Sequence, residues 1–123
     1  MRVAGFGFRQ SATLASLRDV LAQAEGASGP VDLFATATHK VAATPLTALA
    51  EERGLRIVGV DVDGIATETQ STRVASMFGT GSVAEAAALS AAGPGARMVV
   101  PRITSDDAMA TAAIAESTKG QGK

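Results

Sequence analysis

At 123 residues, with 46% hydrophobic residues and a formal net charge of −1 at pH 7, the chain fits one globular domain rather than a disordered segment or a basic nucleic-acid-binding module. Its aromatic residues are four Phe, with neither Trp nor Tyr, so stacking platforms for nucleic acid are scarce and no nucleic-acid partner is expected. The absence of cysteine excludes disulfides and thiolate ligands, and one histidine is too few for a His-based metal site, so we expect no metal and no cofactor.

The first predicted elements are a strand, a helix and a second strand. Residues 3–8 form a short apolar run that is typical of a buried strand. Over residues 11–25 the apolar positions recur at the spacing of a helix that buries one face. Glycine and proline within residues 26–30 end this helix, and the apolar run at 31–36 then predicts the second strand.

A second helix and a third strand follow in the chain. Thr44 and Pro45 have the pattern of an N-cap and a proline at the first helical position, and Gly54 ends this helix. Residues 56–60 predict the third strand. The polar stretch at 61–70 has no periodicity, and no regular element is assigned to it.

The second half of the chain predicts a clear helix and two further strands. After a short helical piece at 71–78, an alanine-rich helix covers residues 82–92 and can lie close to a sheet; the glycines and proline at 93–95 stop it. Residues 97–103 predict a fourth strand. Residues 109–115 predict a fifth strand that returns antiparallel by a hairpin, although alanines within it favour helix.

This order predicts an α/β fold: a single domain with a mainly parallel sheet of about five strands, flanking helices and an antiparallel last strand. The domain is expected to cover residues 1–116, followed by a disordered tail at 117–123. No apolar run has the length that a bilayer requires, and the N-terminus lacks the apolar reach of a signal peptide. We therefore expect a soluble, cytoplasmic protein without a membrane partner.

The most informative segment is Gly79-Thr80-Gly81-Ser82, directly before the alanine-rich helix. Ser82 and Glu85 have the S-x-x-E spacing of a capping box, and the two glycines allow close approach to the backbone. Free N–H groups and the positive end of the helix dipole would meet here, which suits an anion. A tight turn that only starts a helix explains the same residues.

Further polar residues follow the predicted strands. In open α/β sheets the ligand lies outside the carboxyl ends of the parallel strands. Glycines and cations gather there and suit a large anionic ligand. These candidates are Gly5, Gly7 and Arg9 after the first strand, Lys40 after the second, and Arg102 after the fourth.

A catalytic set is not visible. Gly5-Phe6-Gly7 does not continue into a dinucleotide fingerprint, because Gln10 stands at the last glycine position. His39 is the lone histidine and there is no G-x-S-x-G elbow, so nothing specific supports a nucleophilic triad. From its residues alone, the chain is a small α/β domain suited to an anion.

The residues quoted above resemble the cobalamin-biosynthesis family of CobE and the C-terminal domain of CbiG, over the whole chain up to its tail. The most specific part is residues 79–89, Gly-Thr-Gly-Ser-Val-Ala-Glu-Ala-Ala-Ala-Leu. It is accompanied, in the family's order, by Gly-x-Gly-x-Arg at 5–9, by Lys40 and by Val-Val-Pro-Arg at 99–102. Phe8 stands where the family often has cysteine, so no cysteine-dependent role is implied.

The resemblance implies a protein of the aerobic cobalamin (vitamin B12) pathway that binds or carries a polycarboxylate corrinoid or precorrin intermediate. Arg9, Lys40, Arg73 and Arg102, with the turn at 79–82, are then the groups for the ligand's carboxylates. Side chains for the ring face are Phe8, Met77 and Phe78.

Two alternatives stay open, and with them the question of whether the protein is an enzyme. CbiG proteins are linked to lactone opening of cobalt-precorrin 5A, so the resemblance also allows a precorrin-processing hydrolase with the 79–82 turn as oxyanion stabiliser. The other alternative is a domain that docks on another enzyme of the pathway, such as a corrin-ring methyltransferase.

Overall fold

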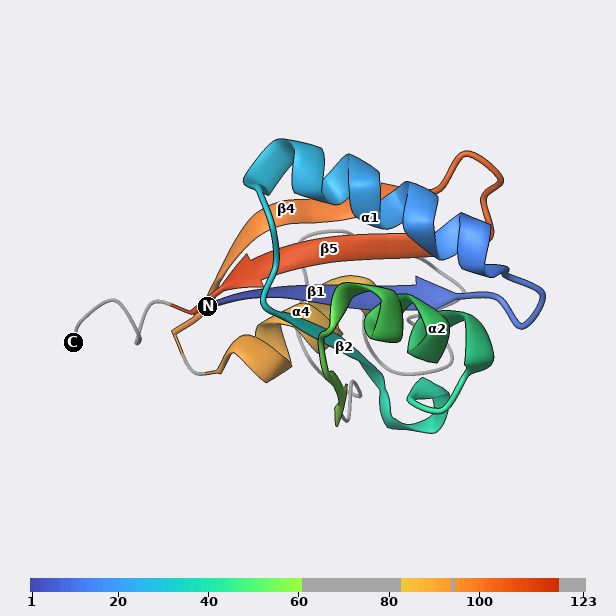
Figure 1. Ribbon diagram of the computed structural model, residues 1–123. Helices are drawn as coiled ribbons and strands as arrows, with labels where there is room; N and C mark the ends of the chain where they lie inside the picture. Colours follow the sequence, from blue (N-terminus) through green and yellow to red (C-terminus); the bar gives the residue numbers. More distant parts are fainter. Residues whose placement is uncertain (61–82, 94, 118–123) are drawn as a thin grey trace.

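The computed structural model describes residues 1–60, 83–93 and 95–117. Within these ranges, five strands form one sheet in the order β3-β2-β1-β5-β4, and helices lie on both of its faces (Figure 1). The elements are β1 (Arg2–Phe8), α1 (Leu14–Ser28), β2 (Leu33–Ala37), the 3-10 turn η1 (Thr38–Lys40), α2 (Thr44–Arg53), β3 (Ile57–Val60), α4 (Val83–Ala92), β4 (Arg97–Thr104) and β5 (Ala110–Glu116).

The predicted fold class is confirmed. Strand β1 pairs with β2, and β2 with β3, in parallel. The last strand, β5, lies between β1 and β4 and is antiparallel to both. Its alanines, which favour helix, serve here as small buried side chains in the middle of the sheet: Ala112, Ala113 and Ala115 are fully buried. Their size leaves room for helices to approach the sheet.

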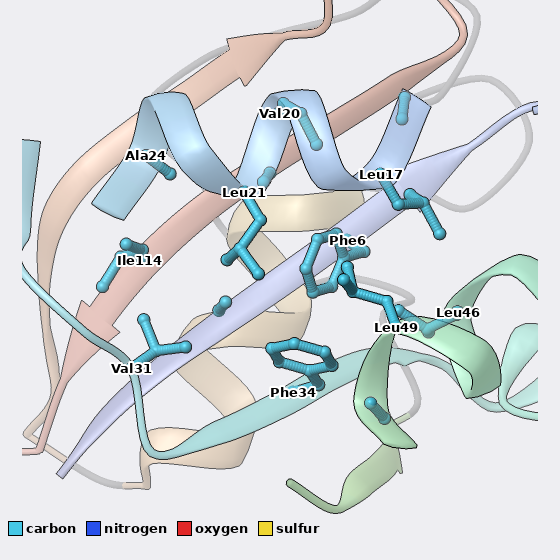
Figure 2. Close-up of a cluster of buried hydrophobic side chains, with 14 of the residues drawn as sticks. Phe6, Leu17, Val20, Leu21, Ala24, Val31, Phe34, Leu46, Leu49 and Ile114 are labelled. Atoms are coloured by element: carbon cyan, nitrogen blue, oxygen red, sulfur yellow. The ribbon is translucent and has the colours of Figure 1, made fainter. Parts of the chain in front are cut away.

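Helices α1 and α2 cover one face of the sheet and form the larger core (Figure 2). The rings of Phe6 from β1 and Phe34 from β2 meet edge to face, with centroids 5.0 Å apart. Leucines from both helices close over them, and all of these side chains are excluded from water, which supplies most of the driving force for folding. The leucines are Leu17 and Leu21 of α1 and Leu46 and Leu49 of α2.

Helix α4 covers the opposite face and contacts all five strands. It packs unusually close to β1 because Gly5 has no side chain. A Cβ on Gly5 would fall far inside van der Waals contact of the Ala84 carbonyl oxygen and 2.6 Å from the amide nitrogen of Ala88. The predicted close approach of the alanine-rich helix is therefore confirmed.

The helix boundaries differ slightly from those predicted. Helix α1 begins after Thr13, whose side chain forms a capping box with Ser16, so it starts later than residue 11. The N-cap of α2 is Ala43 and not Thr44, because the Ala43 carbonyl accepts the N–H of Thr47 and the first turn starts one residue early. Gly54 ends α2 in the left-handed conformation, as predicted, with φ 68°.

Several predictions fall on residues outside the described ranges. These are the unassigned stretch at 61–70, the helical piece at 71–78, the Ser82 half of the capping box and most of the tail. The domain boundary at residue 116 coincides with the end of β5 but stays a prediction. In the part of the chain that is described, no helix combines the length and apolar character needed to cross a bilayer.

The β4–β5 hairpin is fastened to α1 through Asp107. This carboxylate accepts hydrogen bonds from the hydroxyls of Ser105 and Ser16, both at 2.6 Å, and from the N–H of Met109 at 3.0 Å. These donors stabilise the charged form and lower the pKa of Asp107 below its ordinary value. The contribution of this carboxylate to stability is therefore present above the pKa of the unfolded chain and is lost as the pH falls through the lower, folded-state pKa.

We expect Asp107→Asn to lower the free energy of unfolding at neutral pH. A neutral amide oxygen accepts weaker hydrogen bonds than a carboxylate, and the NH2 group of Asn would face the three donors from Ser16, Ser105 and Met109 without an acceptor. The difference between the two proteins should shrink below about pH 4, where the unfolded-state carboxyl titrates. Urea unfolding at a series of pH values measures this. A difference that stays constant down to pH 2 would contradict the role of the charge.

Candidate functional site

The carboxyl ends of β1, β2 and β4 lie at the same edge of the sheet, which also carries η1 and the β4–β5 hairpin (right side of Figure 1). Lys40, at the end of η1, reaches across this edge to the end of β1. Its Nζ donates a hydrogen bond to the Phe8 carbonyl oxygen at 3.1 Å and lies 4.8 Å from the centroid of the Phe8 ring. The structure thus brings together the two predicted segments that follow the first and second strands.

The end of β1 is held by three side chains from its neighbours. The carbonyl of Phe6 accepts the hydroxyl of Thr36 at 2.9 Å, and that of Gly7 accepts the hydroxyl of Thr111 at 3.1 Å. Lys40 completes the series at the next carbonyl, Phe8. Three consecutive carbonyls each receive a side-chain donor, so the backbone that leads into Arg9 is well fixed.

Gly7 marks the point where the first turn of α4 meets this edge. A Cβ on Gly7 would lie 2.9 Å from the Thr111 hydroxyl, 3.4 Å from Val83 Cβ and 3.6 Å from the amide nitrogen of Ala84. The amino end of α4 is therefore next to the carboxyl end of β1, where its dipole favours negative charge. Gly5 and Gly7 have a clear packing role in this approach; direct ligand contact by either glycine stays a prediction.

Arg102 lies within β4 and not after it, in contrast to its placement from the sequence. The strand is irregular here: Val100 pairs with Ile114 and Ile103 with Ala112, so the β4 side has one extra residue. The freed N–H of Arg102 donates to Oε2 of Glu85 at 2.9 Å. Glu85 is fully buried in the first turn of α4 and thereby joins that turn to the bulge.

The arginines at this edge differ from most of the others in their pairing. Arg9 is exposed and Arg102 is half-buried, and within the described ranges neither guanidinium has an ion pair or a side-chain hydrogen bond. Elsewhere in the described ranges, Arg56 also has no ion pair, and four arginines each pair with a glutamate: Arg2, Arg18, Arg53 and Arg97. The two predicted candidates thus keep their charge available for an external anion.

The remaining predicted residues are outside the described part of the chain. These are Arg73, Met77, Phe78 and the turn Gly79, Thr80, Gly81 and Ser82. Their roles stay predictions, although Val83, which follows the turn, lies at the site edge beside Gly7. Among the residues that are described, no group of acidic or histidine side chains is arranged to hold a metal ion.

Two residues of this edge were not recognised as such from the sequence. Thr111 is the lone hydroxyl in the alanine run of β5, and that isolated polar residue was the available signal. Glu85 was interpreted only as a capping residue, yet it also holds the bulge of β4. A single acid within an alanine-rich helix is a sign of a specific buried partner, because burial of an unpaired carboxylate is costly.

The fold and this edge define the class: a small α/β domain with a mixed five-stranded sheet and a cationic carboxyl edge beside a helix N-terminus. The family model of the cobalamin synthesis G C-terminus matches residues 2–115. The chain therefore belongs to this family and is a protein of cobalamin biosynthesis, as its motifs predict.

Solved structures agree with this assignment. The chain is similar to CobE, a protein from the cobalamin (vitamin B12) biosynthetic pathway, with 26% identity, a TM-score of 0.79, and coverage of 94% of this chain and 89% of that one. It is also similar to the cobalamin biosynthesis protein ChiG from Agrobacterium tumefaciens, with 35% identity, a TM-score of 0.73, and coverage of 96% and 99%.

A putative cobalamin biosynthesis protein G homolog from Sulfolobus solfataricus shares the fold, with 17% identity and a TM-score of 0.69. The match covers 94% of this chain but 36% of that longer one. A comparison with curated proteins found no match.

Proposed function

We propose that this protein binds a polycarboxylate corrinoid intermediate of cobalamin biosynthesis and holds it without chemical turnover. The observation that carries the proposal is the grouping of cations at the carboxyl edge. Arg9 and Arg102 lie there without a carboxylate partner among the described residues, while four of the five other described arginines, all except Arg56, pair with a glutamate. Lys40 lies at the same edge. Several separated cations around one edge match a macrocycle ringed by acetate and propionate groups.

The energetics require several of these contacts at once. An exposed charge pair contributes only about 1 kcal/mol, and association itself has a large entropic cost. The helix dipole of α4 adds a favourable term for an anion at its amino end. Family membership supports a corrinoid as the ligand, since the intermediates of this pathway are polycarboxylates. The same proposal includes other enzymes of the pathway as partners and the cytoplasm as the location.

The test is a visible-absorbance titration with hydrogenobyrinic acid, a metal-free corrinoid, followed by gel filtration. Pigment that co-elutes at a fixed ratio with its spectrum unchanged would support binding without turnover. A changed pigment would instead favour the precorrin-processing hydrolase. Failure to co-elute would contradict the proposal, and capture of a pathway methyltransferase without pigment would favour a docking domain.

The same titration tests the assignment of the cations. We expect the double variant Arg9→Ala/Lys40→Ala to bind hydrogenobyrinic acid about 10- to 30-fold more weakly, because two contacts of about 1 kcal/mol are lost. Arg56→Ala removes one charge and is the control for each single variant, Arg9→Ala and Lys40→Ala: this exposed arginine precedes β3 and so lies at the opposite, amino edge of the parallel strands. Equal weakening by the control would show that only net charge matters.

A further inference from the structure

Phe8 contacts the ammonium of Lys40 in two ways. Its carbonyl oxygen accepts a hydrogen bond from Nζ at 3.1 Å, and its ring lies beneath the same nitrogen, 4.8 Å from the centroid. The separation is within the range of a cation–π interaction. Main chain and side chain of one residue thus hold one cation at the carboxyl edge of the sheet.

The Phe8 ring is itself held in place from the other side. It packs against the core cluster between the sheet and helices α1 and α2, which includes Phe6. Its backbone is fixed by pairing with Ala110 of β5 and by the donors on the two preceding carbonyls. A ring that is packed against the core and covered by Lys40 is poorly placed as a floor for the macrocycle, which is the role expected from the sequence.

Lys40 still has donor capacity in this arrangement. An ammonium carries three N–H groups, and within the described residues the Phe8 carbonyl is the one hydrogen-bond acceptor that Nζ contacts. Lysine is normally a flexible point charge, and the ordering of its long side chain opposes binding. Here the two contacts with Phe8 order the side chain within the fold itself, so part of that cost is already offset.

We propose that Phe8 is a positioning residue that fixes the ammonium of Lys40 to receive one carboxylate of the corrinoid. The inference rests on the proposed function, since it assigns a role within the same site. It differs from a general need for positive charge, because it requires the aromatic ring: an aliphatic residue at position 8 would keep the carbonyl hydrogen bond but lose the second contact.

The test is a double-mutant cycle in the hydrogenobyrinic acid titration, with Phe8→Leu and Phe8→Tyr made in the wild-type and Lys40→Ala backgrounds. We expect Phe8→Leu to weaken binding about three- to fivefold, at most the whole contribution expected of the Lys40 contact. Phe8→Tyr keeps the ring and should bind within about twofold of wild type. In the Lys40→Ala background, Phe8→Leu should have no further effect.

A second measurement needs no ligand. In the wild-type protein the ring should shift the proton resonances of the Lys40 ε-methylene upfield in NMR spectra. Phe8→Leu should abolish this shift, while the other resonances keep the dispersion of a folded protein. Equal weakening by Phe8→Leu in both backgrounds would assign Phe8 a merely structural role and overturn the inference. Unchanged affinity of Phe8→Leu would overturn it too and leave the proposed function intact. Absence of binding by the wild type would overturn the proposed function itself.

Discussion

Replacement of Gly5 by alanine is expected to lower the free energy of unfolding by about 3 kcal/mol or more, at the upper end of what overpacking usually costs. The new methyl group would collide with backbone atoms, the carbonyl oxygen of Ala84 and the amide nitrogen of Ala88. Backbone atoms of a helix cannot rotate aside as a side chain can. Either α4 must move away from the sheet or β1 must bend, and both would open the core on that face.

Two other glycines make this prediction specific. Gly26→Ala, in α1, meets nothing within 4 Å and should stabilise the protein by about 0.5–1 kcal/mol, the usual gain from alanine in a helix. Gly7→Ala should fall between the two, because its nearest neighbour is the side-chain hydroxyl of Thr111, which can turn away. Urea unfolding of the three variants checks this order. A Gly5→Ala midpoint equal to that of wild type would show that α4 does not lie against β1 as described.

The elements that the sequence predicted well are those with local patterns. Short apolar runs marked the strands, and the helical spacing of Leu17, Val20 and Leu21 marked the face of α1 that is buried. Strand β5 shows the limit of this reasoning. Its alanines favour helix, and it is a strand because β1 and β4 pair with it on both sides, a tertiary effect that outweighs propensity.

The candidate site was predictable in outline and not in its contacts. Topology alone places residues that follow parallel strands at one edge, which is why Arg9 and Lys40 were recognised. The contact of Lys40 with Phe8 joins residues 32 positions apart, and no local pattern encodes it. Arg102 was assigned to the end of a strand predicted over residues 97–103, and the register shift that releases its N–H from the ladder with β5 has no local sequence pattern.

The loss of the Glu85 side chain should be the other large effect. We expect Glu85→Ala to lower the free energy of unfolding by about 2–3 kcal/mol. This is the usual cost of losing a hydrogen bond to a charged group and leaving a buried donor, the Arg102 N–H, without an acceptor. The carboxylate is fully buried and accepts the N–H of Arg102 where the bulge has removed that group from the ladder with β5. Without it, the first turn of α4 is no longer joined to β4.

Amide hydrogen exchange distinguishes this mechanism from a general loss of packing. In the wild-type protein the Arg102 amide should be protected, and in Glu85→Ala it should exchange far faster than its neighbours that remain in the β4–β5 ladder. Glu85→Gln keeps the shape and an acceptor oxygen, so it should retain most of the protection and cost less stability than alanine. Ser90→Ala, at an exposed position of the same helix, is the control and should change stability by less than about 0.5 kcal/mol. If the Arg102 amide stays protected in Glu85→Ala, another group must hold the bulge. The carboxylate of Glu85 would then not be what links the first turn of α4 to β4.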